Sequence, residues 1–189
     1  EDVPVLAGIV FDTSDSIGDK LPRCKEAIVH FLKVLNPEDE FFLVRFSEGA
    51  MLSVDSTRDI EKILRTLLLI KAHGRTALFD GIYLAMNHTR NVNARKALLV
   101  ISDGGDNGSR YTESERKEAV READVQIYTI GIFEPAEGMG RTPEELHGPE
   151  LLAEIAEWTG GRYFPVENSN QLKNIVEKIG LELHNQYIL

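Results

Sequence analysis

The chain has 189 residues, of which 42% are hydrophobic and 28% charged, and its formal net charge is -10. This length suits a single domain with a full hydrophobic core, and the composition excludes a disordered chain. The negative charge and the lack of a long basic stretch argue against nucleic acid as a partner. No apolar run approaches the roughly 20 residues that a membrane span requires, so we expect no membrane insertion by this chain.

The first half of the chain alternates apolar strands with amphipathic helices. Residues 3–11 are a continuous apolar run, which is typical of a strand covered on both faces. Residues 20–35 carry apolar side chains at helical spacing. The elements predicted next are a strand at 41–46, a short edge strand at 50–54, a helix at 57–70 opened by Thr57, and a helix at 77–90.

The second half continues the same alternation. The predicted elements are a strand at 96–102, a helix at 112–123, a strand at 125–133, a helix at 149–161, a short strand at 162–166 and a closing helix at 170–186. Thr112 and Glu115 have the spacing of a capping box at the start of the helix. The loop at 134–149 is long, and we expect it to help shape the surface that contacts a partner.

This alternation predicts an α/β fold with one domain over residues 1–189. We expect a doubly wound, mostly parallel central sheet of about six strands, flanked by helices, in which the short edge strand can run antiparallel. A strand-like apolar run begins almost at once, at residue 3, and the chain stops at an apolar end, so we interpret the domain as excised from a longer protein. The single cysteine, Cys24, excludes an internal disulfide and a CxxC zinc site, and we expect it to pack on a helix.

Small oxygen-bearing side chains follow the predicted strands. Asp12, Ser14 and Ser16 alternate directly after the first strand, Asp103 follows the strand at 96–102, and Thr76 precedes the helix at 77–90. Ligands of such sheets bind beyond the carboxyl ends of the strands, so these side chains can meet at one rim. Hydroxyl and carboxylate oxygens suit a hard cation such as Mg²⁺, which usually retains water. One coordination position can then accept a carboxylate from elsewhere.

Three segments together resemble a known family. DTSDS at 12–16, GRTALFD at 74–80 and ISDGGDN at 101–107, in this order between apolar strands, are similar to the von Willebrand factor A domain, and most to its bacterial branch. That family has a Rossmann-like fold and a metal-ion-dependent adhesion site, built from Asp-x-Ser-x-Ser, a distant Thr and a distant Asp. The resemblance implies the following metal ligands: Asp12, Ser14, Ser16, Thr76 and Asp103.

The resemblance also implies a function in adhesion or protein interaction, without enzymatic activity. The cation would be Mg²⁺, Mn²⁺ or Ca²⁺, and the partner a protein that presents Glu or Asp, either a separate molecule or a neighbouring domain. Adhesion-type members favour a location outside the cytoplasm. The motif departs from the family at Asp15, where Gly is common, and this substitution can change the preference for a partner.

Two other functions compete with this interpretation. Asp12 could be the nucleophile of a Mg²⁺-dependent phosphoryl transferase or hydrolase, although Ser14 stands where haloacid-dehalogenase-like enzymes have a second Asp. Nucleotide binding is disfavoured because no glycine-rich phosphate loop follows a strand. Some of these residues could have structural roles instead of binding a metal. Ser14, Ser16 and Thr76 can cap helices, and Asp106 and Asn107 can form turns.

Overall fold

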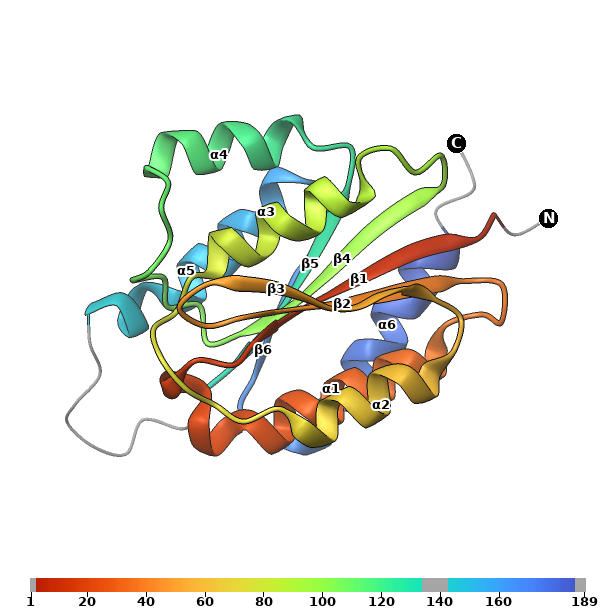
Figure 1. Ribbon diagram of the computed structural model, residues 1–189, viewed down its shortest axis with the longest axis horizontal. Helices are drawn as coiled ribbons and strands as arrows, with labels where there is room; N and C mark the ends of the chain where they lie inside the picture. The colour runs from red at the N-terminus through yellow and green to blue at the C-terminus, as the bar shows by residue number, and fades with distance from the viewer. Residues whose placement is uncertain (1–2, 134–142, 186–189) are drawn as a thin grey trace.

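The computed structural model describes residues 3–133 and 143–185 (Figure 1). A six-stranded sheet runs through the middle of the molecule in the order β3-β2-β1-β4-β5-β6. Its strands are β1 (Val5–Asp12), β2 (Glu40–Phe46), β3 (Ala50–Thr57), β4 (Arg95–Ser102), β5 (Gln126–Ile132) and β6 (Tyr163–Val166). All neighbours pair in parallel except β2 and β3, which pair antiparallel. The predicted mostly parallel α/β sheet with an antiparallel edge strand is confirmed.

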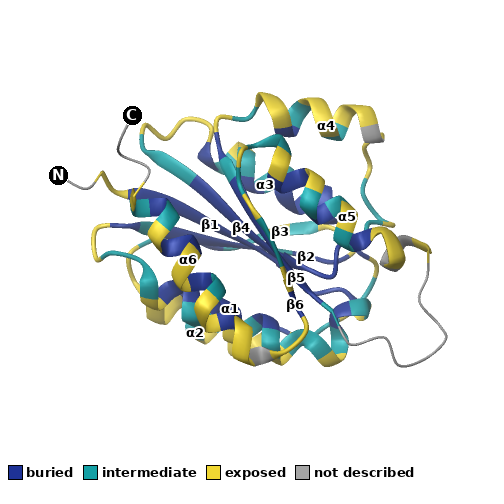
Figure 2. Cartoon of the chain, turned by 180° about the vertical axis from the view of Figure 1, so that it is seen from behind, coloured by how far each residue is buried: buried dark blue, intermediate teal, exposed yellow. Residues whose placement is uncertain are grey.

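Helices cover both faces of the sheet (Figures 1 and 2). One layer contains α1 (Leu21–Val34), α2 (Ile60–Leu69) and α6 (Leu172–Asn185), and the other contains α3 (Leu78–Thr89), α4 (Glu113–Glu122) and α5 (Pro143–Trp158). Two short 3-10 helices, η1 (Asp15–Lys20) and η2 (Ser169–Gln171), precede α1 and α6. Each layer closes its own apolar cluster against the sheet, which is the arrangement of a doubly wound fold.

Strand β1 lies at the centre of the molecule, and all eight of its residues are buried. Its side chains alternate between the two apolar clusters: Phe11 belongs to the α1 side and Val10 to the α3 side. Gly8 is required in this strand, because a side chain there would collide with Phe42 and Leu98 on the neighbouring strands. Burial on both faces explains why the sequence of this strand is a continuous apolar run.

Two predicted boundaries are wrong. Thr57 does not open α2, because β3 extends to Thr57 by pairing with Phe41, and the N-cap is Asp59, whose side chain accepts a hydrogen bond from the amide of Glu61. Helix α5 begins at Pro143, so Pro149 lies inside the helix and does not open it. A proline suits the first helical turn, where its missing N–H is unneeded.

The change at α5 also alters the predicted loop. Residues 143–149 of the expected loop at 134–149 are helical, and residues 134–142 lie outside the described residues. The capping box of α4 is confirmed, with Thr112 and Glu115 bonding reciprocally. Among the helices in residues 3–133 and 143–185, none combines the length and apolarity needed to cross a membrane.

Candidate metal centre

The predicted site residues stand at the carboxyl edge of the sheet. Strand β1 ends at Asp12, and its parallel neighbour β4 ends at Ser102, directly before Asp103. The two strands are in register, with Phe11 opposite Ile101, so the residues that follow emerge side by side. The sheet thus brings together two acids that are far apart in the sequence.

The carboxylate of Asp12 is enclosed by donors from two strand ends. Its Oδ1 accepts hydrogen bonds from the backbone amide of Ser14 at 2.9 Å and from the Ser14 hydroxyl at 2.6 Å. Its Oδ2 accepts a hydrogen bond from the Ser102 hydroxyl at 2.5 Å. The side chain is fully buried, so these contacts hold the carboxylate in one orientation.

The two serine hydroxyls of the first loop lie next to each other, with Ser14 Oγ and Ser16 Oγ 3.1 Å apart. Ser14 is the N-cap residue of η1, yet its side chain makes no capping hydrogen bond and turns to Asp12 instead. The helix-capping interpretation of Ser14 is therefore wrong. The turn of η1, which the sequence analysis did not predict, returns Ser16 to the same side as Ser14.

The loop before α3 is tied to the first loop through the backbone. The amide of His73 donates to the carbonyl of Thr13 at 2.8 Å, and the amide of Asp15 donates to the carbonyl of Gly74 at 2.9 Å. Gly74 has a φ of 79°, in the left-handed region that favours glycine. Gly74 thus allows the turn by which the chain contacts the first loop shortly before Thr76.

The third loop is tied to Thr76. The amide of Thr76 donates to Asn107 Oδ1 at 2.9 Å, and the amide of Asn107 donates back to the Thr76 carbonyl at 3.0 Å. Thr76 is buried but does not cap α3, because the N-cap position belongs to Ala77. Asn107 therefore does more than form a turn, since it joins the loop after β4 to the loop before α3.

A lysine that was not predicted from the sequence completes the cluster. Lys20 Nζ, at the end of η1, lies 2.9 Å from Asp103 Oδ2. The side chains of Lys20 and Asp103 are only 16% and 3% exposed, so this ion pair is largely shielded from water. Among the residues that the structure describes, the other oxygen of Asp103 accepts one long hydrogen bond, at 3.5 Å from the amide of Gly105.

The electrostatics of the site favour a bound cation. Burial, and then the charge of Asp103, raise the pKa of Asp12 to about 7. Asp106, farther along the third loop, also has a raised pKa because of burial, but it is paired with Arg116 at 2.6 Å and with Ser109. Asp106 supports the loop, whereas Asp12 and Asp103 together carry more negative charge than Lys20 offsets.

The donor chemistry fits a hard divalent cation. Two buried carboxylates and neighbouring hydroxyls are oxygen donors of the kind that Mg²⁺ and Mn²⁺ take. Across the described ranges, no group of three or more His, Cys, Asp or Glu residues could hold a metal, so such a site depends on its hydroxyls. Ser102 was missed as a contributor, although a polar residue that ends an apolar strand next to Asp103 was an available signal.

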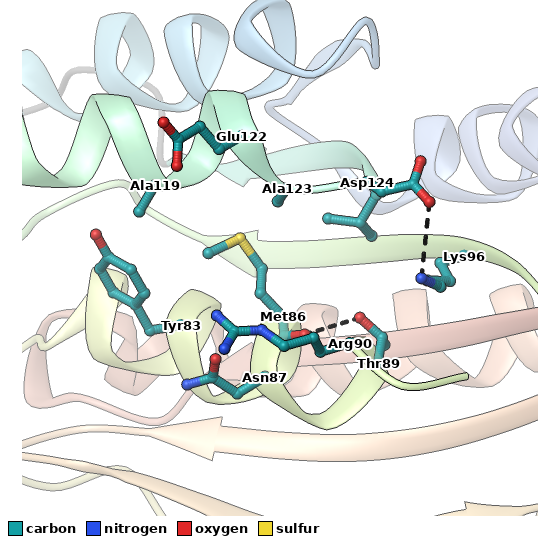
Figure 3. A pocket seen from close by; sticks show the side chains of 11 residues that line it. Tyr83, Met86, Asn87, Thr89, Arg90, Lys96, Ala119, Glu122, Ala123 and Asp124 are labelled. Atoms are coloured by element: carbon teal, nitrogen blue, oxygen red, sulfur yellow. Dashed lines mark hydrogen bonds and ion pairs between the residues drawn. The ribbon is translucent and has the colours of Figure 1, made fainter. Parts of the chain in front are cut away.

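A hollow of about 320 Å³ lies elsewhere, between α3 and α4 (Figure 3). Met86, Arg90 and Ala123 line it, together with Lys96 near the start of β4, so it opens at the edge of the sheet opposite Asp103. Lys96 and Asp124 already pair with each other at 3.8 Å. The hollow is therefore separate from the candidate metal centre.

Fold and site together define a doubly wound α/β domain with an oxygen-rich cluster at the carboxyl edge of its sheet. The family profile of the von Willebrand factor type A domain matches residues 8–178, and the chain belongs to this family. An uncharacterized protein of Borreliella burgdorferi is 26% identical over 95% of the chain, and the match spans 62% of that relative. The chain thus covers less than two thirds of this relative's length.

Solved structures show the same fold. The conserved hypothetical protein BatB from Bacteroides thetaiotaomicron superposes with a TM-score of 0.75 at 23% identity, covering 95% of this chain and 98% of that one. The pilus adhesin SpaC from Lactobacillus rhamnosus GG, in its open conformation, superposes with a TM-score of 0.76 at 12% identity, covering 96% of this chain and 30% of that one. The fold expected from the resemblance is confirmed.

Proposed function

We propose that the chain is a protein-binding module that depends on a divalent cation, held by Asp12, Ser14, Ser16, Thr76 and Asp103. The observation that carries the proposal is the cluster itself, in which the loops after β1 and β4 bring a fully buried Asp12, two adjacent hydroxyls and Asp103 to one rim. The loop that contains Thr76 is hydrogen-bonded to both of them. When bound there, Mg²⁺ or Mn²⁺ would supply an electrophilic position that accepts a Glu or Asp side chain of a protein partner.

The residues of the chain have separate tasks in this proposal. Ser14, Ser16 and Thr76 provide neutral oxygens, which leave most of the cation's charge available to an incoming carboxylate. Asp12 and Asp103 offset part of that charge, and Ser102 keeps Asp12 oriented through its 2.5 Å hydrogen bond. The likeness to a pilus adhesin domain is consistent with a binding module, and the partial coverage of the Borreliella relative with a module of a longer protein.

Phosphoryl transfer by Asp12 has less support. A nucleophilic carboxylate must reach the phosphorus atom of a substrate, whereas Asp12 is fully buried and both of its oxygens accept hydrogen bonds from serines. Hydrolysis of p-nitrophenyl phosphate in Mg²⁺ that is lost in Asp12→Ala would favour the enzyme. If the protein does not hydrolyse p-nitrophenyl phosphate but binds peptides only in the presence of the cation, the result favours the protein-binding module.

A random peptide library tests the binding function. We expect panning in Mg²⁺ with elution by a chelator to enrich peptides that share an Asp or Glu, because the cation needs a carboxylate ligand. Synthetic versions of these peptides should bind the wild type only in Mg²⁺ and should not bind Asp12→Ala. Enrichment that persists in chelator, or on the Asp12→Ala variant, would contradict the proposal.

A further inference from the structure

Lys20 is placed so that its charge acts on the candidate metal centre. It ends η1, the 3-10 helix that starts within the first loop, and the next residue, Leu21, begins α1. The backbone on both sides of Lys20 is therefore held in helices. Its ammonium lies 2.9 Å from Asp103 Oδ2, within a pair that is largely shielded from water.

The charges around this pair are unequal. Asp12 and Asp103 are both buried, and each raises the free energy of a negative charge on the other. Lys20 is the cation whose pairing with Asp103 the structure records, and it offsets one of the two negative charges. The protein thus already supplies a positive charge at the position where a metal ion would find its acidic ligand.

The Lys20 ammonium opposes the binding of a divalent cation in either of two arrangements. The cation can take Asp103 away from Lys20, which breaks a shielded ion pair. Alternatively, it can use the other oxygen of Asp103, and then two positive charges lie a few ångströms apart in a medium of low polarity. In both arrangements Lys20 lowers the affinity for the cation.

We infer that Lys20 is a built-in competitor of the divalent cation for Asp103, which makes the metal centre weaker than its oxygen donors alone would make it. Cation occupancy then depends on the surrounding concentration of Mg²⁺ or Mn²⁺, and the chain can present a paired, metal-free rim when that concentration is low. This inference rests on the proposed function, because it needs the same cation site.

Isothermal titration with Mn²⁺ of the wild type and of Lys20→Met tests the inference. We expect Lys20→Met to bind Mn²⁺ about tenfold more tightly or better, since removal of a nearby charge of the same sign is worth at least a factor of this order. Lys20→Arg keeps the charge and should stay close to the wild type. Lys25→Met is the matched control. Lys25, which lies on α1, is half-buried like Lys20, but its ammonium donates a hydrogen bond to the carbonyl of Ile70.

Thermal unfolding in chelator gives a second readout. Metal-free Lys20→Met should unfold at a lower temperature than the wild type, because Asp103 loses its partner, and saturating Mn²⁺ should remove most of the difference. If Lys20→Met does not fold, Lys20→Gln replaces it in both measurements.

The outcomes separate the inference from the proposed function. Equal or weaker Mn²⁺ binding by Lys20→Met, with binding by the wild type and none by Asp12→Ala, overturns the role of Lys20 and leaves the metal centre intact. No Mn²⁺ binding by either the wild type or Lys20→Met overturns the metal centre and the inference together.

Discussion

Asp12 is a carboxylate that the fold keeps away from water and close to a second acid. Desolvation and the charge of Asp103 raise its pKa to about 7, while Ser14 and Ser102 donate hydrogen bonds to it. Such a group costs the metal-free protein free energy when it is ionised. Residues placed for function in this way often oppose stability.

The substitution Asp12→Asn should therefore abolish cation binding and stabilise the metal-free protein above neutral pH. Between about pH 4 and pH 7 the folded wild type retains a proton that the unfolded chain releases, so its unfolding free energy falls as pH rises through this window. The loss can reach about 4 kcal/mol, and the variant lacks it. Chemical denaturation in chelator at pH 5 and pH 8 measures the gain, which should be larger at pH 8.

The exposed Asp124 provides the control for this measurement. Asp124→Asn, at the other edge of the sheet, should bind Mn²⁺ like the wild type and show no comparable gain. A gain for Asp12→Asn that is the same at pH 5 and pH 8 would show that the charge of Asp12 is not its cause.

At the scale of elements, the site is assembled by the ends of strands and by bonds between loops. Strands β1 and β4 place Asp12 and Asp103 side by side, while the loop before α3 is joined to its neighbours by backbone and amide contacts. Asn107, which lies in the third loop, makes two hydrogen bonds with the backbone of Thr76 and so joins the third loop to the loop before α3. Outer contacts of this kind orient the groups that bind a metal.

Asn107→Ala should loosen the site more than it destabilises the fold. The amide of Thr76 would lose its acceptor at 2.9 Å, with an expected loss of about 1–2 kcal/mol in the free energy of unfolding. The affinity for Mn²⁺ should fall about 10-fold or more, because Thr76 is no longer held in place. Calorimetric titration and urea denaturation measure the two effects.

Asn91 is the exposed asparagine that serves as the comparison. Asn91→Ala should change neither quantity appreciably. If Asn107→Ala lowers stability but leaves Mn²⁺ affinity unchanged, Asn107 has a structural role alone.

At the scale of the whole molecule, the sheet is the platform that joins the site to global stability. The central strand β1 is buried along its whole length and ends at Asp12, so the candidate centre continues from the most buried part of the core. A cation that binds only the folded arrangement of the three loops must therefore stabilise the entire domain.

Mg²⁺ or Mn²⁺ should raise the midpoint of thermal unfolding in a concentration-dependent way. At a concentration about 100 times Kd the expected stabilisation is about 2.7 kcal/mol, which corresponds to roughly 5–10 °C for a domain of this size. Scanning calorimetry across a Mn²⁺ series measures the shift. Asp12→Asn should show none, and an equal shift in both proteins would place the binding elsewhere.

Local patterns in the sequence were sufficient for much of the fold. Alternation of apolar strands with helical periods predicted the layered α/β sheet, and the capping box predicted the start of α4. The boundaries at Thr57 and Pro149 failed, because β2 extends β3 by pairing and because α5 begins six residues earlier than Pro149, at Pro143. Pairing and packing between distant segments override local signals at such ends.

The order of strands and helices, the family, and the five oxygen-bearing residues could all be predicted from the sequence alone, and metal binding by these five residues stays a prediction. The order of the elements follows from side-chain periodicity, whereas the family and the set of five residues are what the resemblance of three short segments implies. All of these are local patterns. Three contacts became visible only in the folded chain: Ser102 donates to Asp12, Asn107 joins two loops, and Lys20 pairs with Asp103, 83 positions away in the chain. Parallel strands that neighbour in the sheet need not neighbour in the sequence, so such contacts exist only once the strand order brings their loops to one edge.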